Sequence, residues 1–209
     1  GLARVYLFSY CSLQTLLHAF LVVKTATLLL NGEYRWESVS TLAIGGTLLQ
    51  LVDVVHCLIG FTKGNVTNSL VQIGGRFSML QILRYSMETR DGFAAGLLVL
   101  VYATAEPCRY PYYAMNALGK EVYALMWIRY SAFILLYPAG LTLEAINTFL
   151  ALPYYYDHYS IRLPFMTINV GVTTGLFLFL VFPFIARFLL FHMVKQRKAK
   201  LGPKDSKTK

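Results

Sequence analysis

A tyrosine and a glutamate seven residues apart in an apolar stretch are the residues of this chain best suited to chemistry. The stretch WIRYSAFILLYPAGLTLE covers residues 127–144 and contains Tyr137 and Glu144. Seven residues are about two helical turns, so both side chains lie on nearly one face, about 10 Å apart along an unbroken helix. A buried phenol and carboxylate at membrane depth need partners or a function. Pro138 and Gly140 between them predict a kink that opens the backbone, which often marks a cavity.

Further polar residues occur at helical spacing in neighbouring apolar stretches. Three pairs lie about one helical turn apart: Asp53 and His56, Gln72 and Arg76, and Glu106 and Arg109. Residues at this spacing share a helix face. A single pair of this kind commonly holds membrane helices together. Several on consecutive segments indicate a shared polar cavity, which is how membrane enzymes and transporters accommodate buried charge.

The elements that must position these residues are apolar segments of membrane-spanning length. Hydrophobic residues make up 56% of the 209 residues and charged residues 14%, which is typical of a polytopic membrane protein. Six segments are each near the roughly 20 residues that cross a bilayer as helix. They cover 5–30, 39–60, 66–87, 92–114, 121–151 and 165–193. We therefore predict an all-α fold, with a six-helix transmembrane bundle over 1–194 and a basic cytoplasmic tail over 195–209.

The basic charge of the chain is concentrated at its carboxy terminus. Of the net charge of +9, residues 195–209 contribute seven Lys or Arg and one Asp. Because this tail follows an apolar span directly, it indicates a cytoplasmic end beside anionic lipid and not a nucleic-acid site. An even number of spans then places both termini in the cytoplasm.

The cysteines predict neither a disulfide framework nor a metal site. Cys11, Cys57 and Cys108 are scattered through apolar stretches without a CxxC pair or a zinc-ligand spacing. His56-Cys57, followed by five residues and Lys63, imitates the HCx5R loop of tyrosine phosphatases. Lysine replaces the bidentate arginine of that loop, so phosphatase chemistry is disfavoured.

Four ordered elements carry a resemblance to a known family. The first is Trp127, Arg129, Tyr130, Leu136-Tyr137-Pro138, Gly140 and Glu144, followed by Ala151-Leu152-Pro153. The others are Gln72-Ile-Gly-Gly-Arg76, Glu106-Pro-Cys-Arg109-Tyr110-Pro-Tyr-Tyr113 and His192-Met-Val-Lys-Gln-Arg-Lys198. Together they resemble the signature of the very-long-chain 3-hydroxyacyl-CoA dehydratases, once called protein tyrosine phosphatase-like. The departures from the family pattern are Asp53 for Glu, Gly75 for Ser, Tyr102 for Trp and Pro107-Cys108 for an aliphatic pair.

The resemblance implies an endoplasmic reticulum membrane enzyme with six spans. Such an enzyme converts long and very-long-chain 3-hydroxyacyl-CoA to trans-2-enoyl-CoA, the third step of the fatty acid elongation cycle. The implied partners are the other elongation enzymes: the elongase, the ketoacyl-CoA reductase and the enoyl-CoA reductase. The implied catalytic residues are Tyr137 and Glu144. We expect support or substrate positioning from six further residues: Arg129, Tyr130, Arg109, Glu106, Arg76 and Gln72.

This reaction needs positioned acid and base groups and no redox cofactor. A proton leaves C2, negative charge grows on the thioester oxygen, and the departing C3 hydroxyl is protonated. Our hypothesis has Tyr137 as base or hydrogen-bonding partner and Glu144 as acid, with Arg109 and Arg129 shaping the charge around them. The reverse assignment of base and acid stays open. The acyl chain would lie among the helices, with Lys63, Lys120 or the tail attracting the CoA head.

Two other classes of function use the same residues differently. A small-molecule transporter would use the buried polar residues as a pathway, but it more naturally shows internal repeats or paired broken helices. We find no internal repeat in the sequence. A non-catalytic membrane scaffold of the same fold would keep the bundle without the reaction, and the intact Tyr137 and Glu144 argue mildly against it. Formation of trans-2-enoyl-CoA by the purified protein distinguishes both from the enzyme.

Overall fold

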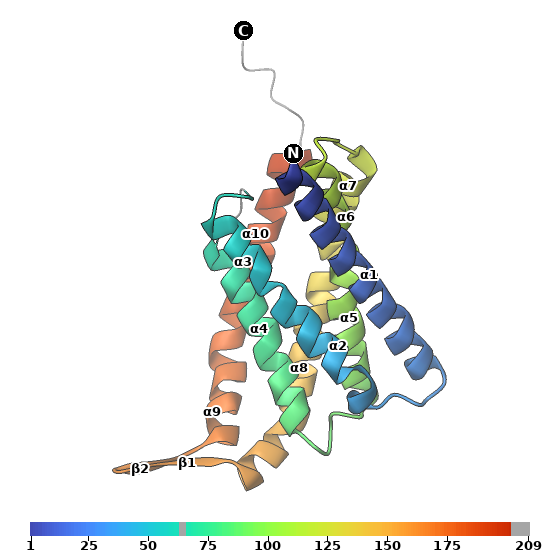
Figure 1. Ribbon diagram of the computed structural model, residues 1–209. Coiled ribbons are helices and arrows are strands. Elements are labelled where there is room, and N and C mark those ends of the chain that lie inside the picture. The colour runs from blue at the N-terminus through green and yellow to red at the C-terminus, as the bar shows by residue number, and fades with distance from the viewer. Residues whose placement is uncertain (63–65, 202–209) are drawn as a thin grey trace.

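A bundle of long helices makes up almost all of the computed structural model, which describes residues 1–62 and 66–201 (Figure 1). The first half contains α1 (Leu2–Leu30), α2 (Trp36–Leu49), α3 (Leu51–Leu58), α4 (Val66–Tyr85), α5 (Phe93–Ala105) and α6 (Tyr110–Ala117). The second half contains α7 (Tyr123–Ser131), α8 (Phe133–His158), β1 (Ser160–Leu163), β2 (Met166–Asn169), α9 (Val170–Leu176), the π-helical turn η1 (Phe177–Val181) and α10 (Phe182–Leu201). Neighbouring helices combine into long rods, such as α2 with α3 and α7 with α8.

Four of these rods are long and apolar enough to cross a membrane. They are Leu2–Leu30, Trp36–Leu58, Tyr123–His158 and Val170–Lys198. The other two predicted spans are helical, but they do not meet that standard within the described ranges. The polar residues Gln72 and Arg76 lie within the continuous helix α4 and make it less apolar. α5 has 13 residues, which extend about 20 Å before the helix ends at Glu106. The prediction of an almost entirely helical fold is therefore confirmed, with four helices long and apolar enough to cross a membrane, whereas the count of six spans is not.

The chain between the fifth predicted span and Val170 differs from an all-α fold, because residues 166–169 of the sixth predicted span form a strand and the helix begins only at Val170. β1 and β2 form an antiparallel hairpin with Ile161 opposite Ile168 and Leu163 opposite Met166. The helix before it continues through Pro153 to His158, seven residues beyond the predicted end of that span. Contacts to other helices hold these last turns, because Ala151 and Tyr155 are buried and the Tyr155 hydroxyl donates to the Ile82 carbonyl at 3.0 Å. The missing hydrogen bond at Pro153 is thus compensated by packing.

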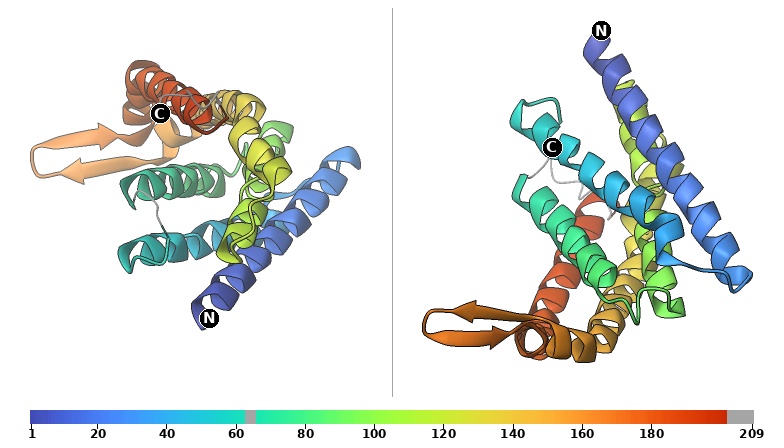
Figure 2. Two further views of the ribbon diagram at one scale, coloured as in Figure 1. Left: turned by 90° about the horizontal axis from the view of Figure 1, so that it is seen from above. Right: turned by 60° about the horizontal axis from the view of Figure 1, so that its bottom comes forward.

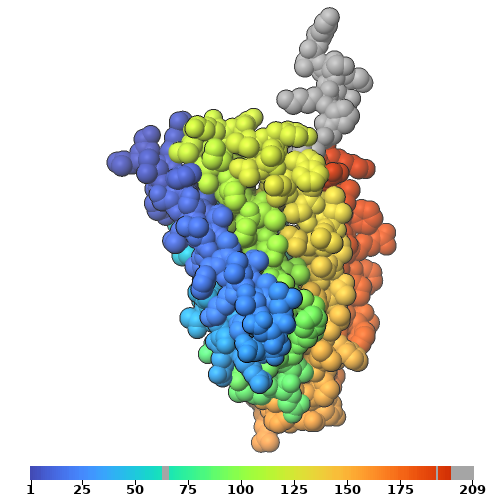
Figure 3. Space-filling view, turned by 90° about the vertical axis from the view of Figure 1, so that its right-hand side faces the viewer, coloured from blue at the N-terminus to red at the C-terminus, as the bar shows by residue number. Residues whose placement is uncertain are grey.

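The apolar core lies where α1, α2, α4 and α5 meet. Its fully buried members include Val39, Leu80, Leu83, Leu98 and Val99. In the face drawn in Figure 3, α1 lies beside the segment that forms α5 and α6, with α7 and α8 next to them. The polar residues discussed below are therefore enclosed by helices on several sides.

The two ends of the bundle contain different connections. The start of α1, the end of α10 and the turn between α6 and α7 lie at one end (Figures 1 and 2). The turns after α1 and α4, together with the hairpin, lie at the opposite end. α10 runs on without a break from residue 194 to Leu201. Most of the predicted tail, residues 202–209, falls outside the described part of the chain, as does Lys63.

Candidate active site

The polar site begins at the break between α5 and α6. Pro107 and Pro111 have no backbone N–H, so neither can make the i to i−4 hydrogen bond of a continuous helix. The chain forms turns instead, in which the amides of Arg109 and Tyr110 both donate to the Glu106 carbonyl at 2.9 Å. This turn directs the side chains of Glu106 and Arg109 into the bundle.

Glu106 lies at the centre of a buried ion-pair cluster. Its side chain is fully buried, and its two carboxylate oxygens pair separately with Arg76 of α4 and Arg109. Arg109 also lies 3.7 Å from the carboxylate of Asp53 on α3. The cluster of Asp53, Arg76, Glu106 and Arg109 thus has two positive and two negative groups, and this balance makes burial of the charges tolerable. The predicted pair of Glu106 and Arg109 is confirmed.

The other two predicted pairs differ in the structure. Asp53 accepts a hydrogen bond from the Tyr110 hydroxyl at 2.6 Å, while His56 is 3.0 Å from the hydroxyl of Tyr6 on α1. Gln72 is half-buried one turn before Arg76, and in the described ranges no hydrogen bond joins it to this cluster. Sequence spacing finds same-helix neighbours, but here the partners come from other helices.

Glu144 is held by a residue outside the predicted site. The hydroxyl of Tyr102 on α5 donates to Glu144 Oε1 at 2.6 Å. The guanidinium of Arg76 lies over the Tyr102 ring, 5.2 Å from its centroid. Tyr102 therefore connects Glu144 to the ion-pair cluster. No signal of this role for Tyr102 was present in the sequence, because an aromatic residue in a helix as apolar as α5 is expected to pack in the core like its apolar neighbours.

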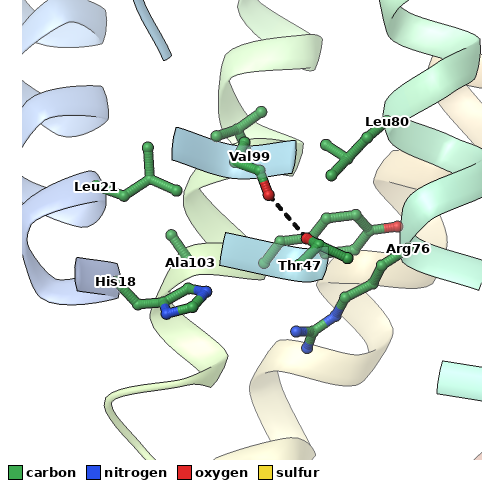
Figure 4. A pocket seen from close by; sticks show the side chains of 9 residues that line it. His18, Leu21, Thr47, Arg76, Leu80, Val99 and Ala103 are labelled. Carbon is green, nitrogen blue, oxygen red and sulfur yellow. Dashed lines mark hydrogen bonds between the residues drawn. The ribbon is translucent and has the colours of Figure 1, made fainter. Parts of the chain in front are cut away.

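A small cavity adjoins Arg76 and Tyr102. Its volume is about 10 Å³, close to the space for a single water molecule. His18 and Arg76 point toward it from α1 and α4, and Thr47 of α2 lies beside it (Figure 4). At this place the polar groups of the predicted shared polar cavity contact one another directly and leave only this small space. Neither Tyr137 nor Glu144 lines this small cavity.

The first helix supplies polar residues that sequence reasoning did not assign to the site. Gln14 and His18 are buried and one turn apart, and His18 Nδ1 is 2.9 Å from the Gln14 carbonyl. His18 Nε2 is 3.4 Å from Gln50 of the α2–α3 junction, and Gln14 donates to the Tyr10 hydroxyl at 3.1 Å. Their spacing in an apolar helix was the signal that would have found them. They extend the polar interior from α4 and α5 to α1.

Tyr137 lies two turns before Glu144 on the same helix. α8 continues through Pro138, so the predicted kink does not end the helix. Tyr137 is half-buried, and in the part of the chain that the structure describes its hydroxyl forms no hydrogen bond and its ring no cation–π contact. This free hydroxyl and the tethered carboxylate of Glu144 belong to one helix face, as the spacing predicts.

Arg129 and Tyr130 form a separate group near α6. Arg129 Nε donates to the Tyr113 hydroxyl at 3.0 Å, and its guanidinium lies 5.3 Å from the centroid of the Tyr130 ring. Arg109 is engaged by Glu106 and Asp53. In residues 1–62 and 66–201 neither arginine forms a hydrogen bond or ion pair with Tyr137 or Glu144, so their effect on the charge around this pair stays a prediction. Arg76 is connected to Glu144 through Tyr102.

The remaining sequence candidates carry no site in the described residues. Residues 1–62 and 66–201 contain no group of three or more His, Cys, Asp or Glu that could hold a metal ion. Cys57 lies at the end of α3 with its sulfur 3.2 Å from the Thr62 hydroxyl. Lys63, the last residue of the phosphatase-like pattern, is outside the described residues. Lys120 is exposed in the turn between α6 and α7.

Comparisons with known proteins identify relatives over most of the chain. The family model described as protein tyrosine phosphatase-like protein, PTPLA, matches residues 47–203. Very-long-chain (3R)-3-hydroxyacyl-CoA dehydratase 1 of Canis lupus familiaris is 34% identical over 154 residues, which are 71% of this chain and 61% of that protein. Very-long-chain (3R)-3-hydroxyacyl-CoA dehydratase 3 of Mus musculus is 28% identical over 99% of this chain and 60% of its own length.

A plant relative extends the same pattern. Very-long-chain (3R)-3-hydroxyacyl-CoA dehydratase PASTICCINO 2 of Arabidopsis thaliana is 36% identical over 54% of this chain and 53% of its own length. The chain thus spans about half to three fifths of the length of these curated relatives. No solved structure matches the chain. The match of the family model to residues 47–203 and the identity to the dehydratases show that this chain belongs to the protein tyrosine phosphatase-like (PTPLA) family.

Proposed function

We propose that this protein dehydrates long and very-long-chain 3-hydroxyacyl-CoA to trans-2-enoyl-CoA, with Glu144 and Tyr137 as its catalytic residues. The names of its curated relatives support the reaction. The observation that carries the site is the Glu144 carboxylate, which Tyr102 holds inside the bundle. Glu144 lies on the same helix as Tyr137, whose hydroxyl forms no hydrogen bond within residues 1–62 and 66–201. In this proposal the acyl chain lies among the surrounding apolar helices.

The surroundings of the two residues favour different roles for them. A phenol that acts as base needs a nearby cation to stabilise phenolate, and in the described ranges Tyr137 forms no hydrogen bond and no cation–π contact with a Lys or Arg. We therefore assign Tyr137 the neutral role of hydrogen-bond donor to the thioester oxygen, where negative charge develops. Glu144 then moves the proton. Of the roles left open by the sequence, this arrangement favours Tyr137 as hydrogen-bonding partner.

The proposed step balances its atoms and charges. The Glu144 carboxylate takes the C2 proton, and the electrons of that C–H bond form the C2–C3 double bond. As the C3–O bond breaks, the hydroxyl receives a proton from the Glu144 carboxyl and departs as water. Glu144 returns to its starting state, so the reaction consumes no cofactor.

Separate replacement of the two residues tests the site. Purified Glu144→Gln and Tyr137→Phe variants are assayed for trans-2-enoyl-CoA formation from 3-hydroxyacyl-CoA substrates of several chain lengths. We expect a loss of about 100-fold or more for each, the usual size of a positioned proton-transfer or charge-stabilising group. The control variants Glu121→Gln and Tyr123→Phe change exposed residues and are expected to keep full activity. Near-normal dehydration by both site variants contradicts the proposed site.

We also propose that the protein crosses the endoplasmic reticulum membrane six times, with both termini in the cytoplasm. Four long apolar helices support membrane insertion, and α4 and the α5–α6 segment run alongside them (Figure 1). The start of α1 and the end of α10 lie at the same end of the bundle, as an even number of crossings requires. In this orientation the exposed Lys120 lies on the cytoplasmic side, where it attracts the anionic CoA head. The remaining elongation enzymes are the proposed partners.

A further inference from the structure

Among the residues that the structure describes, Tyr102 is the one that donates a hydrogen bond to the Glu144 carboxylate. Its hydroxyl donates to Oε1 at 2.6 Å from α5, a helix 42 residues away in sequence. A donor at this distance selects one rotamer of a carboxylate that would otherwise turn freely. The orientation of Glu144 thus depends on a side chain of another helix.

Tyr102 is itself held firmly from its other side. The Arg76 guanidinium lies 5.2 Å from the ring centroid, and Arg76 is fixed in turn by its ion pair with the fully buried Glu106. The adjoining cavity of about 10 Å³ is too small for the phenol ring to swing into. The ring therefore stays where its hydroxyl reaches Glu144.

We propose that Tyr102 is a positioning residue that orients the Glu144 carboxylate for proton transfer. This inference rests on the proposed function, because it assigns Glu144 the proton-transfer role. The ion-pair cluster has a part in it: Glu106 fixes Arg76, Arg76 fixes the Tyr102 ring, and the Tyr102 hydroxyl fixes Glu144. Loss of the hydroxyl leaves the ring contact in place and releases only the carboxylate.

The test compares Tyr102→Phe with two tyrosine controls in the purified full-length chain. Tyr155→Phe also removes an interhelical hydrogen bond, to the Ile82 carbonyl, but about three turns further along α8 from Glu144, toward the hairpin. Tyr34→Phe removes a buried hydroxyl that has no hydrogen-bond partner in the described residues. We expect kcat to fall about 10- to 100-fold in Tyr102→Phe with little change in KM, the range for a lost hydrogen bond to a charged group. Both controls keep wild-type kcat.

A fourth variant separates the donor from the ring. Tyr102→Trp restores an aromatic N–H donor, so we expect it to recover part of the lost kcat. Wild-type kcat in Tyr102→Phe overturns the inference. A loss of kcat and of melting temperature in Tyr155→Phe as large as in Tyr102→Phe also overturns it. A well-folded Tyr102→Trp variant as slow as Tyr102→Phe also contradicts the role of the donor. If Glu144→Gln is fully active, the proposed function has failed; if it is inactive and Tyr102→Phe is normal, only this inference has failed.

The hairpin carries a second, independent inference, because it has one apolar and one polar face. Alternate residues of a strand point to opposite faces, and directly paired residues share a face. The pairs Ile161–Ile168 and Leu163–Met166 therefore lie on one face, and the pairs Ser160–Asn169 and Arg162–Thr167 on the other. The connection between the strands adds Phe165, which is fully exposed.

The position of the hairpin indicates what covers its apolar face. It connects α8 with α9, the ends of two rods long enough to span a membrane, and extends sideways from the bundle (Figures 1 and 2). A sideways projection at the end of spanning helices lies in the plane of the bilayer surface. Tyrosines surround its base: Tyr154 stacks on His158 at 4.4 Å, and Tyr155 and Tyr159 are 5.3 Å apart. Tyrosine is enriched at membrane–water interfaces, between headgroups and acyl chains.

We infer that the hairpin lies in the bilayer interface with Ile161, Leu163 and Met166 toward the acyl chains. Its polar face, with Arg162 and Thr167, then meets headgroups and water. The interface suits the strands, because their outer edges have backbone N–H and C=O groups that need water or headgroups as partners and would be costly in the hydrocarbon core. The alternation of apolar and polar residues along each strand thus places one face of the hairpin toward lipid and the other toward water.

Adjacent residues on opposite faces give a matched test. Met166→Cys and Thr167→Cys are made with the native cysteines replaced by alanine, spin-labelled, and reconstituted in phosphatidylcholine vesicles. We expect dissolved oxygen to increase the relaxation rate of the spin label at residue 166 more than that of the label at residue 167. A water-soluble nickel complex should increase the relaxation rate of the label at residue 167 more. Leu163→Cys and Arg162→Cys repeat the comparison on β1. Equal exposure of both faces to nickel overturns the inference, and so does protection of both faces from both reagents, which indicates cover by a second copy or another protein.

Discussion

Glu106 is the residue on which the balance of buried charge depends. It is fully buried, and each of its carboxylate oxygens pairs with a different arginine. Arg76 then contacts Tyr102, and Tyr102 binds Glu144. A change at Glu106 therefore affects both the stability of the bundle and the geometry at Glu144.

Replacement of Glu106 by Gln is expected to destabilise the protein strongly. It leaves the two buried guanidinium groups without their shared carboxylate, and loss of one partner of a buried ion pair costs about 3–5 kcal/mol. The measurement is the unfolding midpoint of the purified protein in detergent. The matched control is Glu37→Gln, which breaks the ion pair of an exposed carboxylate with Arg90 and should cost less than about 1 kcal/mol. Equal midpoints for the two variants would show that the buried cluster does not support the fold.

Residue types and spacing predicted part of this cluster. Glu106 and Arg109 are neighbours on one stretch of chain, and their pair is seen. Asp53 and Arg76 were also selected as buried charges, but their partners come from other helices and cannot be read from spacing in one helix. Tyr102 was noted only as a departure from a family pattern. Its hydrogen bond requires α5 and α8 to pack side by side, which sequence periodicity does not specify.

At the scale of elements, the join between α8 and α9 depends on a close backbone contact at Gly171. A Cβ atom added there would lie 2.5 Å from the backbone nitrogen of Tyr156 and 2.7 Å from its Cα. Because these are backbone atoms, no side-chain rotation can relieve the contact. The hairpin connects these same two helices, so its direction depends on this packing.

Gly171→Ala is therefore expected to destabilise the protein by about 1–3 kcal/mol, the usual cost of overpacking. Gly175→Ala, one turn later on α9, is the control. A Cβ there would be 3.7 Å from a methyl group of Leu152, an ordinary contact, so the substitution should be neutral or slightly stabilising. The two unfolding midpoints are compared in the same detergent. A midpoint for Gly171→Ala at or above that of Gly175→Ala would contradict the close packing of α8 on α9.

The sequence predicted the presence of the helices better than the residues at which they begin and end. All six predicted apolar segments contain helix, because their length and composition dominate. The break at Glu106 required attention to Pro107 and Pro111 together, since two prolines four residues apart remove helical hydrogen bonds in two consecutive turns. The hairpin was missed because its strands have four residues each. β1 lies between the predicted spans 121–151 and 165–193, and β2 lies in the first residues of the span 165–193, which was expected to be helical. Its alternation of Ile161, Arg162 and Leu163 was the available signal.

At the scale of the whole molecule, six membrane crossings and four membrane crossings place the turn between α4 and α5 on different sides of the membrane. The turn between α4 and α5 contains the exposed Glu88. If α4 and the α5–α6 segment both cross the membrane, this turn lies on the lumenal side with the turn after α1. If neither crosses, Glu88 lies on the cytoplasmic side.

Cysteine labelling of sealed microsomes decides between these arrangements. The variants Glu33→Cys, Glu88→Cys and Lys120→Cys are made with the native cysteines replaced, and each is treated with a membrane-impermeant maleimide. Lys120→Cys should react directly, and Glu33→Cys only after detergent, in either arrangement. We expect Glu88→Cys to react only after detergent. Direct labelling of Glu88→Cys would exclude six crossings.

The central claim for the molecule is that it forms a double bond by moving the C2 proton through Glu144. The most direct test is the initial rate of trans-2-enoyl-CoA formation by the purified full-length chain, wild type against Glu144→Gln, with a long-chain 3-hydroxyacyl-CoA. The account predicts steady product formation by the wild type and a rate lower by about 100-fold or more in the variant, at an unchanged melting temperature. Absence of enoyl-CoA from the folded wild type, or equal rates for the two proteins, would contradict it.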